Sequence, residues 1–427
     1  MRVSAIFSAL CALVPSLAFA AQVPLSSQQH GKPSALTGND HILPIETLHE
    51  LLTLHRELVK IESISGNEYR VGWWLVSYLK ENGFNVEVQY VGEAEQGENE
   101  HMIGGQAQKR FNVFAWPGEK KFTKVLVSSH IDTVPPYIPY SFDTKKDEIW
   151  GRGTVDAKGS VAAQVIAVKS LLANSSSSVS ADDVSLLFVV GEETGGEGMR
   201  SFSNSSLNPG NYSAVVFGEP TESKLVAGHK GMLAFDINVK GKAAHSGYPW
   251  LGLSANNVLV EALGIVMALE AGRVNGAELR WSEKYGNTTL NIGKISGGVA
   301  RNVVAKEANA GITGRLAAGT PDEAKDALLK ALSPVITAAE KAGGEVTIEF
   351  GDETYGPVDM SCDVEGFECI TVNYGTDIPR LKGDHKRYLY GPGSILVAHS
   401  DNEAIKVHDL ERAVVDYTKL ISVAVEN

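Results

Sequence analysis

Residues 186–196 read LLFVVGEETGG, an apolar run that ends in two adjacent acidic side chains. A continuous apolar run of this length, closed by glycine, is typical of a strand buried on both faces, as in a parallel sheet covered by helices. Glu192 and Glu193 then follow the carboxyl end of that strand. Because parallel strands end at the same edge of a sheet, residues that follow other strands should converge with this pair.

Other metal-ligating residue types stand at or just past the ends of short hydrophobic stretches. They are His130 and Asp132 in SSHIDTVP, Asp156 in GRGTVDAKG, Glu219 in VVFGEP and His399 in ILVAHSDNE. On an extended strand His130 and Asp132 point to the same side, so the carboxylate can orient the imidazole. Two imidazoles and several carboxylates in one crevice are the donors that one or two zinc-like cations need. The sequence therefore predicts a metal site at this sheet edge.

Each of these residues also has an ordinary structural interpretation. A histidine in a His-x-Asp pair is often a hydrogen-bonded core residue, and an aspartate before a helix, such as Asp156, is often its N-cap. A solvated acidic turn explains Glu192 and Glu193 poorly, because a fully apolar run precedes them. The two side chains leave the backbone in different directions, so one can bind metal while the other acts as a general base. The specific signal is the joint recurrence of such residues at strand ends.

The composition is that of an acidic globular protein with room for more than one domain. The 427 residues are 43% hydrophobic and carry a formal net charge of -13. This charge argues against a nucleic-acid partner and against binding to an anionic membrane surface. After the amino terminus, no apolar run approaches the roughly 20 residues of a transmembrane helix.

The amino terminus has the pattern of a secretory signal peptide. Arg2 precedes an apolar region at residues 5–17, and residues 18–20 (Ala-Phe-Ala) form a small-x-small cleavage pattern. We therefore expect residues 1–20 to be removed, residues 21–42 to be a flexible start, and the mature chain to be secreted. Its remaining cysteines, Cys362 and Cys369, form either a disulfide or two free thiols. Sequons that could carry N-linked glycans occur at Asn174, Asn204, Asn211 and Asn287.

Alternating helical and strand-like patterns predict an α/β fold with a doubly wound, mainly parallel sheet. Helical spacing occurs at residues 48–59 and 71–79, and strand patterns occur at 85–88, 125–127, 184–190 and 215–217. After Glu219 the order becomes β-α-β-β-α-β, which is typical of a ferredoxin-like sandwich. Its strands are expected at 232–239, 288–295, 308–316 and 345–350, and its helices at 254–270 and 322–341. We thus expect a catalytic domain, 43–228 and 356–427, interrupted by an inserted α+β domain at 229–355.

Taken together, these motifs resemble the co-catalytic zinc family of glutamate carboxypeptidase, acetylornithine deacetylase and succinyl-diaminopimelate desuccinylase. The family order is kept by SSHIDTVP, GRGTVDAKG, GEETGG, GEP, GKAAHSGYP and AHSDNE. The likeness covers nearly the whole mature chain and is strongest to probable secreted carboxypeptidases of filamentous fungi. It implies two zinc ions per subunit, with Co²⁺ or Mn²⁺ as substitutes, and a homodimer formed through the inserted domain, which also serves as a lid.

The resemblance also implies a role for each residue of the predicted metal site. His130 and Glu219 would bind one zinc ion, Glu193 and His399 the other, and Asp156 would bridge them. Glu192 would be the general base and proton shuttle, and Asp132 would orient His130.

Three more residues are implied to meet the substrate. His245, in GKAAHSGYP, resembles the lid histidine that stabilises the oxyanion and that the partner subunit contributes in some relatives. Asn302, in GGVARNVV, resembles a substrate-binding asparagine, with a turn residue as its structural alternative. Arg315, in GITGRL, resembles the arginine that binds a substrate carboxylate, with a surface cation as the alternative.

The function implied is that of a secreted metallo-carboxypeptidase, which hydrolyses the amide bond next to a free C-terminal carboxylate by attack of a metal-bridging water. An N-acyl-amino-acid deacylase of the acetylornithine type shares every ligand, and Arg315 suits either substrate. Export favours the peptidase, since a biosynthetic deacetylase acts inside the cell. A non-catalytic protein on this fold would lack a ligand or the base, and none is missing. A serine hydrolase is disfavoured because no Gly-x-Ser-x-Gly motif occurs.

Overall fold

The computed structural model describes residues 41–92, 102–103, 106–107 and 109–426. The expected signal peptide, and the expected flexible start up to residue 40, lie outside these residues. Two main sheets carry most of the described chain; the first has a hydrophobic core on each face, and the second has a separate core. No helix among the described residues is long and apolar enough to cross a bilayer.

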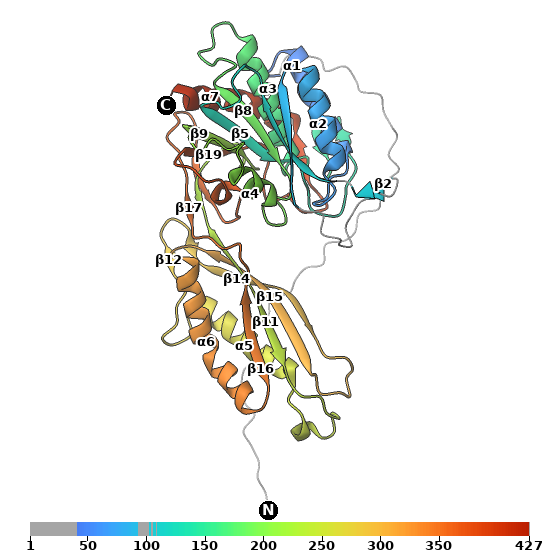
Figure 1. Ribbon diagram of the computed structural model, residues 1–427, viewed down its shortest axis with the longest axis vertical. Helices are drawn as coiled ribbons and strands as arrows, with labels where there is room; N and C mark the ends of the chain where they lie inside the picture. Colours follow the sequence, from blue (N-terminus) through green and yellow to red (C-terminus); the bar gives the residue numbers. More distant parts are fainter. Residues whose placement is uncertain (1–40, 93–101, 104–105, 108, 427) are drawn as a thin grey trace, which may run out of the picture. The chain divides into compact units, whose positions relative to one another are not determined.

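The first sheet has six strands in the order β1-β4-β8-β5-β9-β19 (Figure 1). It is parallel from β8 to β19 and antiparallel where β1, β4 and β8 pair, so the α/β sheet is mixed. The strands are β1 (Asn85–Tyr90), β4 (Phe111–Trp116), β5 (Val125–His130), β8 (Val184–Val189), β9 (Ala214–Gly218) and β19 (Lys386–Tyr390).

Successive side chains of β8 enter two different cores, one on each face of the sheet. Leu186 and Phe188 pack with the long helices, whereas Leu187 and Val189 pack on the side of a short helix. Because both faces are covered, the run is apolar along its whole length. The helices on the first face are α1 (Ile45–Lys60), α2 (Tyr69–Glu81), α3 (Lys158–Ala173) and α7 (Val407–Glu426), and α4 (Glu197–Ser203) lies on the second.

Short strands connect and border this sheet. They form the groups β17-β10-β18, β20-β7-β6 and the pair β2-β3. Their bounds are β2 (Met102–Ile103), β3 (Gln106–Ala107), β6 (Ser141–Asp143), β7 (Glu148–Trp150), β10 (Leu225–His229), β17 (Val358–Asp359), β18 (Cys369–Val372) and β20 (Ala404–Lys406). Cys362 and Cys369 form a disulfide, so of the two alternatives the structure has the bonded pair.

The second sheet is antiparallel, in the order β14-β15-β11-β16. Residues of one face of β11 pack with helices α5 and α6 in a separate core. Ser254 caps α5, and α6 begins with a capping box between Thr320 and Glu323, the signals that fix these helix starts. The elements are β11 (Gly231–Lys240), α5 (Ala255–Glu270), β14 (Thr289–Gly297), β15 (Glu307–Leu316), α6 (Pro321–Lys341) and β16 (Glu345–Phe350). Beside them lie β12 (Trp281–Ser282), β13 (Gly286–Asn287) and the 3-10 turn η1 (Pro249–Leu251).

Candidate metal centre and active site

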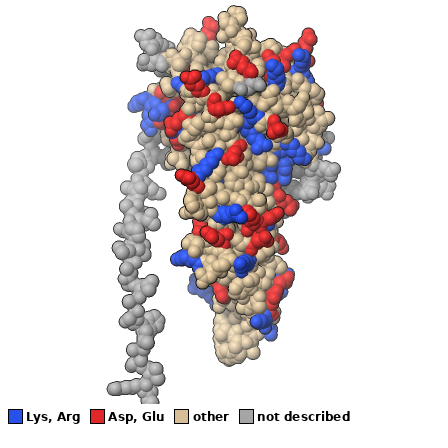
Figure 2. Space-filling model, turned by 90° about the vertical axis from the view of Figure 1, so that its left-hand side faces the viewer, with Lys and Arg blue, Asp and Glu red and all other residues tan. Residues whose placement is uncertain are grey.

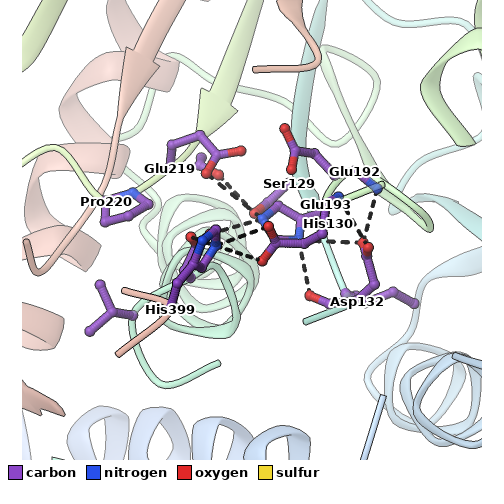
Figure 3. A network of polar contacts seen from close by, with 12 residues as sticks. Ser129, His130, Asp132, Glu192, Glu193, Glu219, Pro220 and His399 are labelled. Carbon is purple, nitrogen blue, oxygen red and sulfur yellow. Dashed lines mark hydrogen bonds and ion pairs between the residues drawn. The ribbon is translucent and has the colours of Figure 1, made fainter. Parts of the chain in front are cut away.

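Four of the predicted site residues lie where neighbouring strands of the first sheet end. Strands β8, β5 and β9 are adjacent and parallel, so their carboxyl ends meet at one edge. His130 is the last residue of β5, Glu219 follows β9, and the pair Glu192–Glu193 comes shortly after β8. Figure 3 shows these side chains gathered around His130 and beside His399.

His399 reaches the same place from a loop. The expectation that His399 follows the end of a strand is wrong: the apolar residues 395–397 before it lie in turns, and Leu396 is 82% exposed. Strand β19 pairs with β9 at this edge of the sheet. Residues 395–397 therefore have no place beside β9. His399 itself has a left-handed backbone, with a φ of 61°.

Asp156 also lies in a loop, two residues before α3. The N-cap of α3 is Ala157, so the carboxylate of Asp156 does not cap the helix. One carboxylate oxygen, Oδ1, lies 3.0 Å from Nε2 of His130, and the other, Oδ2, lies 3.2 Å from Nε2 of His399. This carboxylate therefore stands between the two imidazoles, in the position that a bridging ligand requires.

A buried ion pair joins the loops of Asp156 and His399. Arg152 and Glu403, each 1% exposed, approach to 2.7 Å between Nη1 and Oε2. The other oxygen of Glu403 accepts hydrogen bonds from the backbone N–H groups of Val155 and Asp156, at 3.0 and 3.2 Å. Arg152 in turn donates to the carbonyl of Ser400, next to His399. The pair thus fixes the backbone on both sides of the cluster.

Two further carboxylates, those of Glu219 and Glu193, also lie close to the imidazoles. Oε2 of Glu219 lies 3.7 Å from Nε2 of His130, and Oε2 of Glu193 lies 3.0 Å from Nε2 of His399. By mutual distance, ligand atoms of His130, Glu192 and Glu219 form one group, and those of His130, Asp156 and Glu193 form another. Glu192, implied as the base, therefore lies as close to the centre as the implied ligands do.

Asp132 holds this arrangement from behind. Its carboxylate oxygen Oδ1 lies 3.4 Å from Nδ1 of His130, the nitrogen that faces away from the cluster. The same carboxylate accepts hydrogen bonds from the backbone N–H groups of Glu192 and Glu193, both at 3.2 Å, and from the hydroxyl of Ser65 at 2.7 Å. Asp132 therefore orients both the imidazole and the turn that carries the acidic pair.

The protonation tendencies of the cluster show that its carboxylates need positive charge beside them. Burial raises the pKa of Glu219 to about 8, and burial together with the charge of Glu219 raises the pKa of Glu192 well above that of an ordinary carboxyl. Hydrogen bonds that His399 donates to the carboxylates of Asp156 and Glu193 raise the pKa of His399 to about 10. Protons on the imidazoles thus supply the positive charge that the carboxylates need. Divalent cations would supply it better, and this nitrogen and oxygen donor set fits them.

A cavity of about 270 Å³ opens beside the cluster and is lined by Glu192, Glu219 and His399. Arg315 lines it as well, so the second sheet contributes one predicted substrate-binding residue. His245 and Asn302 do not line this cavity and are exposed. They lie near each other, because His245 bridges to Val303 and the next residue donates to the carbonyl of Asn302. Within one chain, the described structure does not bring these two residues to the metal cluster.

Comparison with known proteins agrees with the geometry. Residues 126–422 match the model of peptidase family M20/M25/M40. A probable carboxypeptidase of Arthroderma otae is 46% identical over an alignment of 445 residues, gaps included. The alignment covers 97% of this chain and 96% of that protein. A probable carboxypeptidase of Aspergillus oryzae is 48% identical, over 98% of this chain and 97% of that protein.

This chain belongs to peptidase family M20/M25/M40.

Solved structures show that the fold of this chain is shared. A tripeptidase from Staphylococcus aureus has a TM-score of 0.69 at 20% identity, over 89% of this chain and 99% of that one. An M20 family metallo-carboxypeptidase from Sulfolobus solfataricus has a TM-score of 0.62 at 18% identity, over 88% of this chain and 100% of that one. At these identities the likeness concerns the fold.

Sequence reasoning missed several residues that shape the site of this M20 peptidase. Arg152 lies in the motif GRGTVDAKG and Glu403 in AHSDNE, but neither was given a role. A charged residue close to a predicted ligand is a signal that could have indicated one. Ser65 gave no local signal, since its contact with Asp132 spans 67 positions. Asp377 follows the strand β18 within the segment YGTD, a polar residue after an apolar run, and it lines the cavity.

Proposed function

We propose that this protein is a secreted, zinc-dependent metallo-carboxypeptidase that hydrolyses the amide bond next to a free C-terminal carboxylate. The observation that carries the proposal is the carboxylate of Asp156, whose two oxygens face two different imidazoles while Glu192 lies in the same cluster. The names of the curated relatives, and that of the solved M20 metallo-carboxypeptidase, support this reaction class.

The metal assignment uses five residues. His130 and Glu219 would hold one ion, Glu193 and His399 the other, and Asp156 both. Imidazole nitrogens with carboxylate oxygens suit zinc, and Co²⁺ or Mn²⁺ could replace it in the same ligands. When bound, the two ions supply positive charge that polarises the scissile carbonyl and lowers the pKa of water.

Glu192 carries the proton through the reaction. It accepts a proton from the attacking water, whose oxygen forms a bond to the carbonyl carbon, and it gives this proton to the nitrogen as the C–N bond breaks. One water is consumed, and an acid and an amine are released. Asp132 keeps His130 in its tautomer and Glu192 in its turn.

Arg315 would bind the carboxylate of the leaving residue. Its guanidinium lines the cavity beside Glu192, and among the described residues it makes no hydrogen bond or ion pair. A planar guanidinium can pair with a carboxylate through two parallel hydrogen bonds. Such a pair places the amide bond nearest the C-terminus at the cluster.

We further propose that the inserted domain is a lid and dimerisation domain, and that a second copy of the chain supplies His245 and Asn302. Both residues are exposed here, and apolar neighbours of His245 are exposed with it: Tyr248 at 55% and Trp250 at 74%. Figure 2 shows few charged side chains at the far end of this domain. Exposed aromatic residues of this kind are typical of interfaces. The lid histidine would then stabilise the oxyanion.

Secretion follows from the signal-peptide pattern in residues 1–20, which lie outside the described structure. The disulfide between Cys362 and Cys369 suits an oxidising compartment. All four sequon asparagines are exposed, so N-linked glycans could attach to the folded chain. The mass and the first residue of the secreted protein, before and after deglycosylation, test these statements.

The decisive experiment measures metal content and hydrolysis on the same purified mature chain. The substrates are peptides with a free C-terminal carboxylate, the same peptides amidated at that end, and N-acetyl amino acids. We expect about two zinc ions per chain, loss of activity on chelation, recovery on adding Zn²⁺, and cleavage of the free-carboxylate peptides above their amides. Activity that survives complete chelation contradicts the metal mechanism. A preference for N-acetyl amino acids over peptides would favour the deacylase instead.

A further inference from the structure

The cavity holds four charged side chains that are not in the metal cluster, and two of them already have partners. Glu353 pairs with Arg380 at 3.0 Å and also with Arg200, which lies outside the lining. The guanidinium of Arg380 also lies over the ring of Tyr355, at 5.4 Å from its centre. The remaining two, Arg315 and Asp377, have no hydrogen bond or ion pair through their side chains among the described residues. One unpartnered cation and one unpartnered anion therefore face the same space.

Asp377 is the more unusual of the two because it is buried. The residue is 6% exposed, and its Oδ2 atom is buried without a hydrogen-bond partner. The carboxylate lies against Gly196, where a Cβ atom would stand 2.5 Å from Oδ1, so only glycine leaves room for it. A buried carboxylate without a partner is destabilising, and such a group in a cavity wall is a candidate for ligand contact.

Asp377 also lies near the base. Its Oδ1 lies against Gly196, in the segment that follows Glu192, and both carboxylates line the same cavity. In a dipeptide the α-amino nitrogen is separated from the scissile carbonyl carbon by only the α-carbon. A group that recognises this nitrogen must therefore lie close to the residue that activates water, as Asp377 does.

We propose that Asp377 binds the free α-ammonium group of the substrate while Arg315 binds its carboxylate, so that the enzyme selects dipeptides in their zwitterionic form. This inference rests on the proposed function, since it takes Glu192 as the base and Arg315 as the carboxylate-binding residue. A cavity of about 270 Å³ suits a ligand of this size; typical small-molecule pockets have roughly 300–1,000 Å³. Burial raises the pKa of Asp377 to about 7, and a bound ammonium would hold its carboxylate ionised.

Three probes separate this selection from the reaction itself. Glycyl-phenylalanine carries the ammonium group, N-acetyl-phenylalanine has hydrogen in its place, and N-acetyl-glycyl-phenylalanine has a neutral amide there. We expect the zinc-loaded wild type to hydrolyse the first with a kcat/KM about 10- to 150-fold above that of either other probe, the range of a hydrogen bond to a charged group. In Asp377→Asn, which keeps the shape, we expect the ratio to fall to about threefold or less.

The matched control is Glu353→Gln, which removes the same charge from the same cavity at a carboxylate that already has partners. We expect it to change all three probes in proportion and to leave their ratio within about twofold. Equal hydrolysis of the three probes by the wild type, or an equal loss on all of them in Asp377→Asn, would overturn the proposal.

Binding to the Glu192→Gln variant, followed by calorimetry, keeps the test independent of turnover. If no probe is hydrolysed but this variant binds glycyl-phenylalanine about 10-fold or more above its acetylated form, the peptidase function fails and the ammonium site stands. If this variant binds both forms equally, the ammonium site fails, whatever the activity of the wild type.

Discussion

The predicted site residues at the edge of the first sheet differ in burial and contacts from His245 in its loop. At the edge, His130, Asp156 and Glu219 are at most 8% exposed, and each contacts another residue of the cluster. In the loop, His245 is exposed and its side-chain contacts are local, to the N–H of Gly247 and the ring of Tyr248.

In the proposed dimer, folding and assembly therefore supply different parts of the proposed site. The sheet edge positions ligands and base through the contacts of one chain, which need nothing from another molecule. In the proposed dimer, the loop would offer its histidine to the other chain. A variant at the sheet edge should therefore abolish the activity of the site in its own chain. A variant in the loop should instead affect the site of the other chain, so that a second chain with an intact loop restores activity.

Glu192→Gln should have the largest effect and tests the edge directly. Loss of the proton acceptor should lower kcat by about 10²- to 10⁴-fold, while the zinc content stays near that of the wild type because Glu192 is not an assigned ligand. Steady-state kinetics and elemental analysis of the same sample check both parts. Turnover close to wild type would remove Glu192 from its role, and loss of zinc would make it a ligand instead.

Glu403→Ala tests whether the edge is held by the ion pair behind it. Removing one partner of a buried pair should lower the free energy of unfolding of the metal-free protein by about 3–5 kcal/mol. It should also weaken zinc binding by about 10- to 100-fold. Urea unfolding and competition with a chelator measure the two effects.

Two variants keep this prediction open to contradiction. The double variant Arg152→Met/Glu403→Met leaves no unpaired charge and should unfold less readily than the single variant. Glu345→Gln breaks an exposed pair with Lys240 and should change stability by about 1 kcal/mol or less. Zinc affinity unchanged in Glu403→Ala would mean that the pair serves the fold alone.

His245→Ala tests the other side of the comparison. Loss of an oxyanion donor should lower kcat by about 10²- to 10³-fold. Mixed with Glu192→Gln under conditions that exchange subunits, it should recover about a quarter of wild-type activity, because half of the dimers are mixed and each mixed dimer has one intact site. No recovery after verified exchange would place His245 in the site of its own chain.

Arg315→Ala should have the smallest effect of the four. It removes one charge-assisted contact, so kcat/KM should fall by about 10- to 100-fold on peptides with a free carboxylate and by less on their amides. Arg380, which also lines the cavity, is the control position for Arg315, because it is already paired with Glu353. Equal losses on free and amidated peptides would contradict the role given to Arg315.

The hydrophobic periodicity of the sequence was sufficient to predict the elements in which burial repeats regularly along the chain. The strands predicted at 184–190 and 215–217 are present as β8 and β9, and the helix predicted at 254–270 is present as α5. Because strand ends were placed correctly, the convergence of His130, Glu193 and Glu219 could be predicted from the sequence.

The rest depends on contacts that a local window does not contain. The turn of His399 is held through Arg152 and Glu403, which are 251 positions apart, so its apolar neighbours misleadingly indicated a strand. Asp377 matters because it is buried against Gly196, far back in the chain. For His245 the motif predicted a role, but one chain alone does not show where that role is exercised.

The ion pair between Arg152 and Glu403 has a consequence for the order of events during synthesis. His399 and Glu403 follow both main sheets in the sequence, whereas Asp156 precedes the whole of the second sheet. A nascent chain that has reached residue 398 already carries both sheets, yet it lacks one imidazole and the carboxylate that fixes the Asp156 loop. Under the proposed ligand set, a chain gains hydrolytic competence only after the segment that carries His399 and Glu403 has been made and has packed against the Asp156 loop.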